Sequence, residues 1–67
     1  MKKHIGYKVE ATLDFGTIIK FVGFITYFDG RNIIVTRSSV FQEETDAWKW
    51  IGDTLAEWEK ELNHSQP

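Results

Sequence analysis

Residues 18–28 (IIKFVGFITYF) carry apolar side chains on both sets of alternating positions. Successive side chains of a strand point to opposite faces of its sheet, so a strand with one solvated face alternates apolar and polar residues. This segment does not alternate in that way. It is therefore predicted to be a central strand with both faces covered.

Two further extended segments flank this strand. Residues 5–13 alternate between apolar and polar positions, and residues 32–38 form a third segment rich in β-branched side chains. The turn signals DFG at 14–16 and DG at 29–30 separate the three segments, and glycine there supplies the positive φ that tight hairpins need. The pattern predicts an antiparallel three-stranded meander.

The register of the first hairpin is predicted from its side chains. Pairing Leu13 with Thr17 places Val9 opposite Phe21, and it sets a carboxylate opposite an ammonium group on the other face. Apolar side chains then share one face and opposite charges meet on the other, as cross-strand pairing favours.

The register of the third strand has two solutions. A two-residue turn pairs Phe24 with Val35, whereas a three-residue turn with a bulge pairs Phe24 with Ile34. The first places Ile33, Val35 and Arg37 on the face away from the helix, and the second places them beneath it. We favour the two-residue turn.

A helix is predicted over residues 42–62. Ser39 followed by Gln42 fits a capping box, and acidic residues in the first turns suit the helix dipole. Apolar residues recur at spacings of three and four and form one stripe. The stripe comprises Trp48, Ile51, Leu55, Trp58 and Leu62, with Ala47 beside them.

Two glycines bear on how this helix packs. Gly23, in the middle of the central strand, leaves room for a large ring, which we expect to be Trp48 or Trp58. Gly52 lies within the helix, where glycine costs about 1 kcal/mol relative to alanine. A close approach of the helix to the sheet at Gly52 is one explanation.

The predicted fold is therefore α+β in the order β-β-β-α, with one domain over residues 1–67 and a frayed tail at 63–67. Sixty-seven residues supply a core worth only about 3–5 kcal/mol, which small domains supplement with disulfides, metals or partner subunits. The chain has no cysteine, so disulfides and thiolate zinc sites are excluded. Oligomerisation remains as a source of stability.

The net charge and the N-terminal residues bear on the binding partner and on the cellular compartment. The net charge of −2 argues against binding nucleic acid through bulk electrostatics. The N-terminal segment MKKHIGYKVE lacks the apolar stretch of a signal peptide, and no run is long enough to span a bilayer. We expect a cytoplasmic protein without a membrane partner.

The sheet face that the helix leaves bare is the first candidate site. A contiguous apolar patch at a surface usually marks an interaction site. We therefore expect a protein partner here, foremost a second copy in a homodimer, although a small twisted sheet also tolerates some exposed apolar residues. The candidate residues are Lys8, Lys20, Val22, Phe24, Phe28, Arg31, Val35 and Arg37.

Nucleic acid is the alternative partner for this face. Basic side chains at a sheet rim contact phosphates, and aromatic rings stack on unpaired bases. In the order of its elements the chain resembles the small sheet-reading DNA-binding domains of recombinase arms, which also place three strands before one helix. No sequence motif of those domains is present.

The outward flank of the helix is the second candidate site. Its acidic residues and one indole suit a basic partner, or they imitate a phosphate backbone as some phage-encoded inhibitors do. The alternative is a solvated acidic face with Trp50 folded over the sheet edge, after a roll of the helix. The flank comprises Glu43, Asp46, Trp50, Asp53, Glu57 and Glu61.

The sequence contains few residues that could form a catalytic site. His4 and His64 lie near opposite ends of the chain, and no nucleophile–base set, acidic pair or phosphate-binding loop occurs at a usable spacing. We expect no enzyme activity, no catalytic residue, no cofactor, no metal and no small-molecule substrate. The sequence predicts a protein-binding module that acts as an accessory or inhibitory protein.

Overall fold

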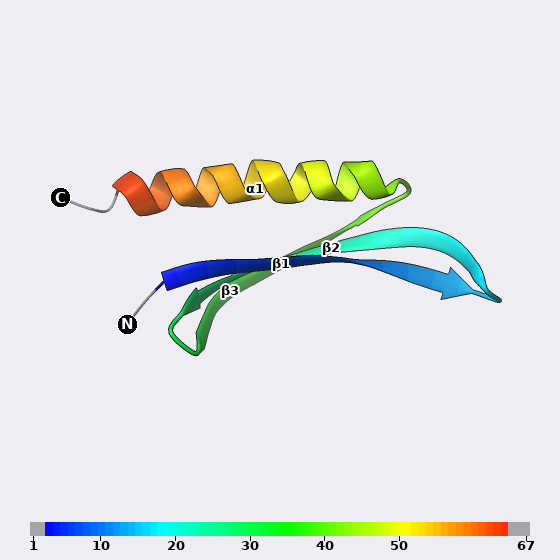
Figure 1. Ribbon diagram of the computed structural model, residues 1–67, viewed down its shortest axis with the longest axis horizontal. Helices are drawn as coiled ribbons and strands as arrows, with labels where there is room; N and C mark the ends of the chain where they lie inside the picture. The colour runs from blue at the N-terminus through cyan, green and yellow to red at the C-terminus, as the bar shows by residue number, and fades with distance from the viewer. Residues whose placement is uncertain (1–2, 65–67) are drawn as a thin grey trace.

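The structure is a computed structural model that describes residues 3–64, with side chains described for residues 3–61. Three antiparallel strands form one open sheet in the order β1-β2-β3, and one helix packs on it (Figure 1). The predicted β-β-β-α architecture is confirmed. The elements are β1 (Lys3–Asp14), β2 (Thr17–Asp29), β3 (Asn32–Phe41) and α1 (Glu44–His64).

The first hairpin turns on two residues, Phe15 and Gly16, whose φ angles of 52° and 79° are both positive. Two positive φ angles are typical of the type I′ turn, whose twist matches that of the flanking strands. The ladder then shifts between Thr12 and Leu13, because β2 carries one extra residue there. The two-residue turn, shorter than the predicted loop 14–16, and the extra residue of β2 each move the register by one, so Val9 lies opposite Gly23 and not Phe21.

This correction leaves the predicted faces of the hairpin intact. The partners of β1 move by two residues along β2, and a shift of two keeps every side chain on its expected face. Tyr7, for example, faces Ile25 on the helix-covered side.

Neither predicted register of β3 is correct. Asp29 pairs with Asn32 around a two-residue turn, and a bulge then follows between Tyr27 and Phe28. Because the bulge absorbs one residue of β3, Phe24 lies opposite Ser38.

The bulge also decides which face each β3 side chain occupies. Val35 pairs with Tyr27 and Arg37 pairs with Ile25, so both lie on the helix-covered face and not on the outer face. Ile33, which precedes the bulge, pairs with Phe28 on the outer face.

The predicted capping box is wrong. Ser39 belongs to β3 and pairs with Gly23, and the strand continues to Phe41 before the helix begins at Glu44. The first backbone hydrogen bond of this region is donated by the Ala47 amide to the Glu43 carbonyl, at 3.4 Å. Ser39, which was predicted to cap the helix, is therefore a paired strand residue.

The far end of α1 also differs from the prediction. The helix includes residues 63 and 64, which were expected to fray, while residues 65–67 of the predicted tail lie outside the described residues.

The core lies between α1 and the middle of β2. Ile25 and Ala47 are fully buried, and Ile51 and Trp58 are nearly so. Thr54 is also buried on this face of the helix. The four buried helix residues recur at spacings of three and four, which is the period of one helix face.

The helix is rolled relative to the predicted stripe. Trp50 lies over Gly23 and contacts Phe41, with ring centroids 5.8 Å apart, while Trp48 is 44% exposed. The room at Gly23 is therefore filled by Trp50, and neither Trp48 nor Trp58 occupies it. Gly52 faces open space, so it does not serve a close approach to the sheet.

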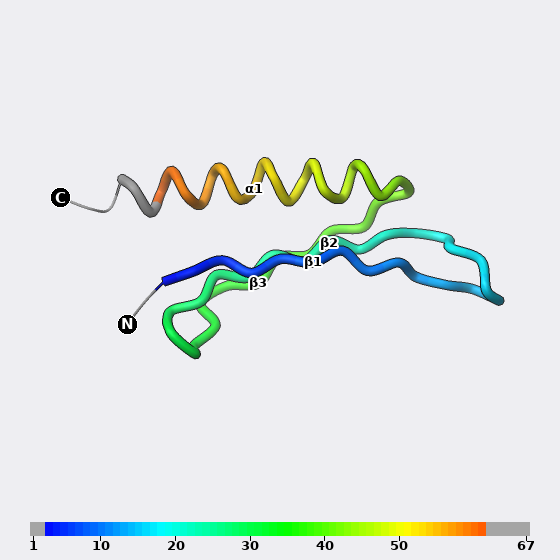
Figure 2. The backbone as a smooth tube through the Cα atoms, viewed as in Figure 1, coloured from blue at the N-terminus to red at the C-terminus, as the bar shows by residue number. Residues whose placement is uncertain are grey.

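The molecule is long and narrow, with extents of 51 × 22 × 11 Å. Its radius of gyration is 14.1 Å, whereas a compact domain of this length has about 11 Å. The β1–β2 hairpin projects past the first turn of the helix (Figure 2). The sheet near Phe15 therefore has no helix above it.

Candidate interaction surface

The outer face of the sheet, opposite α1, is the candidate site. Within residues 3–64 no other element packs on this face (Figure 1). We define the outer face by alternate residues of the three strands: His4, Gly6, Lys8, Glu10 and Thr12 of β1, Lys20, Val22, Phe24, Thr26 and Phe28 of β2, and Ile33, Thr36, Ser38 and Val40 of β3.

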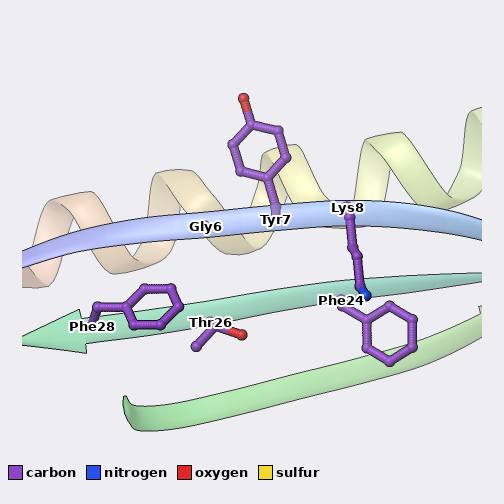
Figure 3. Close-up of a pocket in the computed structure, with 6 residues that line it drawn as sticks. All are labelled: Gly6, Tyr7, Lys8, Phe24, Thr26 and Phe28. Carbon is purple, nitrogen blue, oxygen red and sulfur yellow. The ribbon is translucent and has the colours of Figure 1, made fainter. Parts of the chain in front are cut away.

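A shallow hollow crosses the middle of the outer face. Figure 3 shows Phe24, Thr26 and Phe28 on one side of the sheet, while the Tyr7 ring points the other way, toward the helix. The backbone of Gly6 forms part of the floor, and a Cβ atom there would come within 3.1 Å of the Phe28 ring.

Side chains of the same chain cover this apolar centre only in part. The Phe28 ring stacks on His4, with centroids 4.7 Å apart and planes within 9°. The Lys8 ammonium lies 5.1 Å from the centroid of Phe24. These contacts do not bury Val22 and Phe24 fully, and both side chains are half-buried. Each keeps apolar area that a further partner can remove from water.

The rim of the outer face is close to neutral. Lys8 Nζ lies 2.6 Å from Glu10 Oε1, and both side chains are more than half exposed. The hydroxyl groups of Thr26 and Thr36 are 3.2 Å apart and form a hydrogen bond across β2 and β3. Lys20 is the charged residue that β2 contributes to this face.

Five of the eight predicted outer-face residues lie where they were expected, and three do not. Arg31 lies in the exposed turn between β2 and β3. Val35 and Arg37 lie on the helix-covered face, where the Arg37 guanidinium is 5.7 Å from the centroid of Trp58. The residues that remain on the outer face are Lys8, Lys20, Val22, Phe24 and Phe28.

Sequence reasoning missed several members of the outer face, among them His4, Thr36 and Val40. His4 lay outside the predicted strand, and the two β3 residues depend on the bulge. Alternation along β1 extended by one residue would have found His4. No signal in the sequence marked the bulge.

The predicted helix flank divides into two parts. Its acidic residues are exposed, as expected of a solvated helix face, whereas Trp50 is half-buried against Gly23 and Phe41 and does not belong to the flank. The five exposed acidic residues are Glu43, Asp46, Asp53, Glu57 and Glu61.

Trp48 takes the exposed position that was predicted for Trp50. Its indole Nε1 donates a 3.4 Å hydrogen bond to Glu44 Oε2, and its ring meets Tyr7 edge to face at 6.3 Å. Tyr7 is itself 54% exposed. The two rings form an exposed apolar surface beside β1.

Other chemistry is sparse in the described part of the chain. Over residues 3–61, whose side chains the structure describes, no three His, Asp or Glu side chains gather as metal ligands would. Within residues 3–64, no helix has the length and apolar character needed to cross a membrane. In comparisons with known proteins, no protein-family model, curated protein or solved structure matches this chain.

Proposed function

We propose that this protein is a non-catalytic interaction module whose outer face binds a second copy of the same chain. One observation carries the proposal: Val22 and Phe24 lie at the centre of a sheet face that α1 does not cover, and they remain half-buried. A sheet with two apolar faces is stable when both are packed against another layer.

The shape and surface area support a second copy as the partner. The chain has 5214 Å² of accessible surface, whereas a monomeric protein of 7.8 kDa has about 4,400 Å². The excess is comparable to the roughly 800 Å² that each partner contributes to a standard interface. Two outer faces packed together form an α/β/β/α sandwich, with sheets about 10 Å apart.

The charge of the outer face also favours a protein partner over nucleic acid. The proposed nucleic-acid contacts needed Lys8, Lys20, Arg31 and Arg37, but Arg37 lies on the other face and Lys8 is paired with Glu10. Lys20 on the outer face and Arg31 in the neighbouring turn remain, and two cations are too few for strong phosphate binding. Fluorescence anisotropy with labelled single- and double-stranded DNA at low salt tests the alternative, which predicts tight, salt-sensitive binding.

The remaining surface supports an accessory or inhibitory role. The acidic residues of the flank are exposed, and α1 packs on the sheet face opposite the outer face (Figure 1), so they stay exposed when two outer faces pack together. Such a dimer presents two acidic helices to a basic partner.

Substitution of Phe24 tests outer-face association. Phe24→Asp places a charge in the centre of the interface, and we expect sedimentation equilibrium to show an assembly of half the wild-type mass. Loss of a central aromatic anchor costs about 2 kcal/mol or more, which is roughly a 30-fold weaker association. Phe24→Thr keeps a strand-forming residue and should act in the same direction if Phe24→Asp fails to fold.

Phe15→Asp is the matched control. It makes the same exchange at the exposed hairpin tip, away from the outer face, and should leave the mass unchanged. The proposal fails if the wild-type chain is monomeric at millimolar concentration, or if folded Phe24 variants keep its mass.

A further inference from the structure

Strand β1 is a long outer strand with one unpaired edge. The sheet order is β1-β2-β3, and β1 extends over twelve residues. The extra residue of the first hairpin bulge belongs to β2, so the backbone of β1 is regular along its length. A long, regular edge without proline is a template for pairing with another strand.

The helix-side surface next to this edge is apolar and uncovered. Tyr7 and Trp48 meet edge to face there and are 54% and 44% exposed. Leu13, further along β1, is 62% exposed because the hairpin projects past the first turn of α1 (Figure 2). The shortest extent of the molecule, 11 Å, leaves the sheet little width to bury these side chains.

We propose that β1 pairs antiparallel with β1 of a second copy, centred on Val9, so that two three-stranded sheets join into one of six strands. In this register residues 4–14 of one copy lie beside residues 14–4 of the other. Both helices then lie on the same face of the joined sheet, because facing residues of an antiparallel pair point to the same side.

Charge agrees with this register. With Val9 at the centre, Lys8 of each copy faces Glu10 of the other, and His4 faces Asp14. Centring the pair on Lys8 or on Glu10 would set two like charges directly opposite each other, which destabilises a strand pair. Registers that mate the helix-covered face of one copy with the outer face of the other would mix apolar and charged positions.

Side-chain size agrees with the same register. The helix-side residue opposite Tyr7 is Ala11, whose small side chain leaves space for the Tyr7 and Trp48 rings of the facing copy. An alternation of large and small residues across a seam is how layers interdigitate.

The projecting end of the hairpin also gains a neighbour. Leu13 faces Ile5 of the second copy, and within each chain Ile5 pairs with Tyr27, whose ring lies 6.0 Å from Trp58 beneath α1. The apolar end of one hairpin thus lies beside the helix-covered end of the other.

The β3 edge is less suited to such pairing. It is shorter than β1 and contains the bulge near Ile34, and bulges blunt an edge. Edge pairing joins the backbones of two β1 strands, whereas packing buries the apolar centre of the outer face at Val22 and Phe24, so neither requires the other. Together they give a tetramer with two perpendicular two-fold axes.

A charge exchange tests the register. In the Phe24→Asp background, which removes outer-face packing, Lys8→Glu alone sets glutamates opposite each other, and Glu10→Lys alone sets lysines opposite each other. Each should weaken the remaining association about tenfold or more. An equimolar mixture of the two variants restores opposite charges at every Lys8–Glu10 contact, so we expect native mass spectrometry to show a heterodimer preferred over either homodimer.

Lys49→Glu is the control, since it makes the same charge reversal at an exposed position of α1 and should not change association. Hydrogen exchange supplies a readout that needs no charge variant: the β1 amides of the Phe24→Asp protein should exchange more slowly as its concentration rises. A mixture that associates no better than its components, or β1 exchange independent of concentration, overturns edge pairing. Failure of outer-face packing would instead appear as an unchanged mass for Phe24→Asp.

Discussion

The six-membered ring of Trp50 lies over the backbone of Gly23, so closely that a Cβ atom on that glycine would come within 3.1 Å of the ring. The same indole contacts Phe41 at the end of β3. This contact fixes the roll of α1 on the sheet, because Ala47 and Ile51 are buried when Trp50 occupies the space at Gly23.

Gly23→Val should destabilise the fold. The valine methyl groups would collide with the Trp50 ring, and overpacking of this kind costs about 1–3 kcal/mol. Urea unfolding at a fixed protein concentration measures the loss. In a double-mutant cycle with Trp50→Ala, the two losses should sum to more than the loss in the double variant, since the ring that valine displaces is already absent. Additive losses would show that the contact does not fix the helix.

Gly52→Ala should stabilise the fold. No atom lies within 4 Å of the Cβ that alanine would add, so alanine brings its helix propensity without a clash. The gain is about 1 kcal/mol, which raises the melting temperature of a domain this size by roughly 4–8 °C. Thermal unfolding followed by circular dichroism at one concentration checks it. A lower melting temperature would mean that Gly52 is needed for a contact.

Phe15→Asn should also stabilise the isolated chain. Phe15 is fully exposed and holds a φ of 52°, a left-handed conformation that costs an ordinary L-residue about 1–2 kcal/mol. Asparagine tolerates this conformation and with Gly16 forms the preferred type I′ pair. We expect a gain of about 1 kcal/mol in the free energy of unfolding, measured in urea. A loss would mean that the Phe15 ring contributes contacts in the folded protein.

The agreement between sequence and structure is greatest where the determining interactions are local. The order of elements follows from alternation within each segment and from the glycines between them. The helix-covered and outer faces of β1 and β2 were also predictable, although Val9 faces Gly23 and not Phe21. A shift of two residues leaves the face of a side chain unchanged, so an error in the partner did not become an error in the face.

The candidate site was predictable in its centre and not at its third strand. Val22 and Phe24 lie on the central strand, and the sequence shows that both faces of this strand are apolar. Val35 and Arg37 were assigned to the wrong face because one bulge residue reverses every side chain beyond it. The alternatives for β3 put apolar residues on both faces, so hydrophobicity could not distinguish them.

By itself, the sequence determined the β-β-β-α order and the presence of an apolar sheet face that one helix leaves bare, since both depend on side-chain alternation along the chain. The tertiary structure alone decided the registers of the two hairpins and the roll of α1. Those depend on where one extra residue is accommodated in a ladder and on which indole fits over Gly23, and both result from packing between segments distant in the sequence.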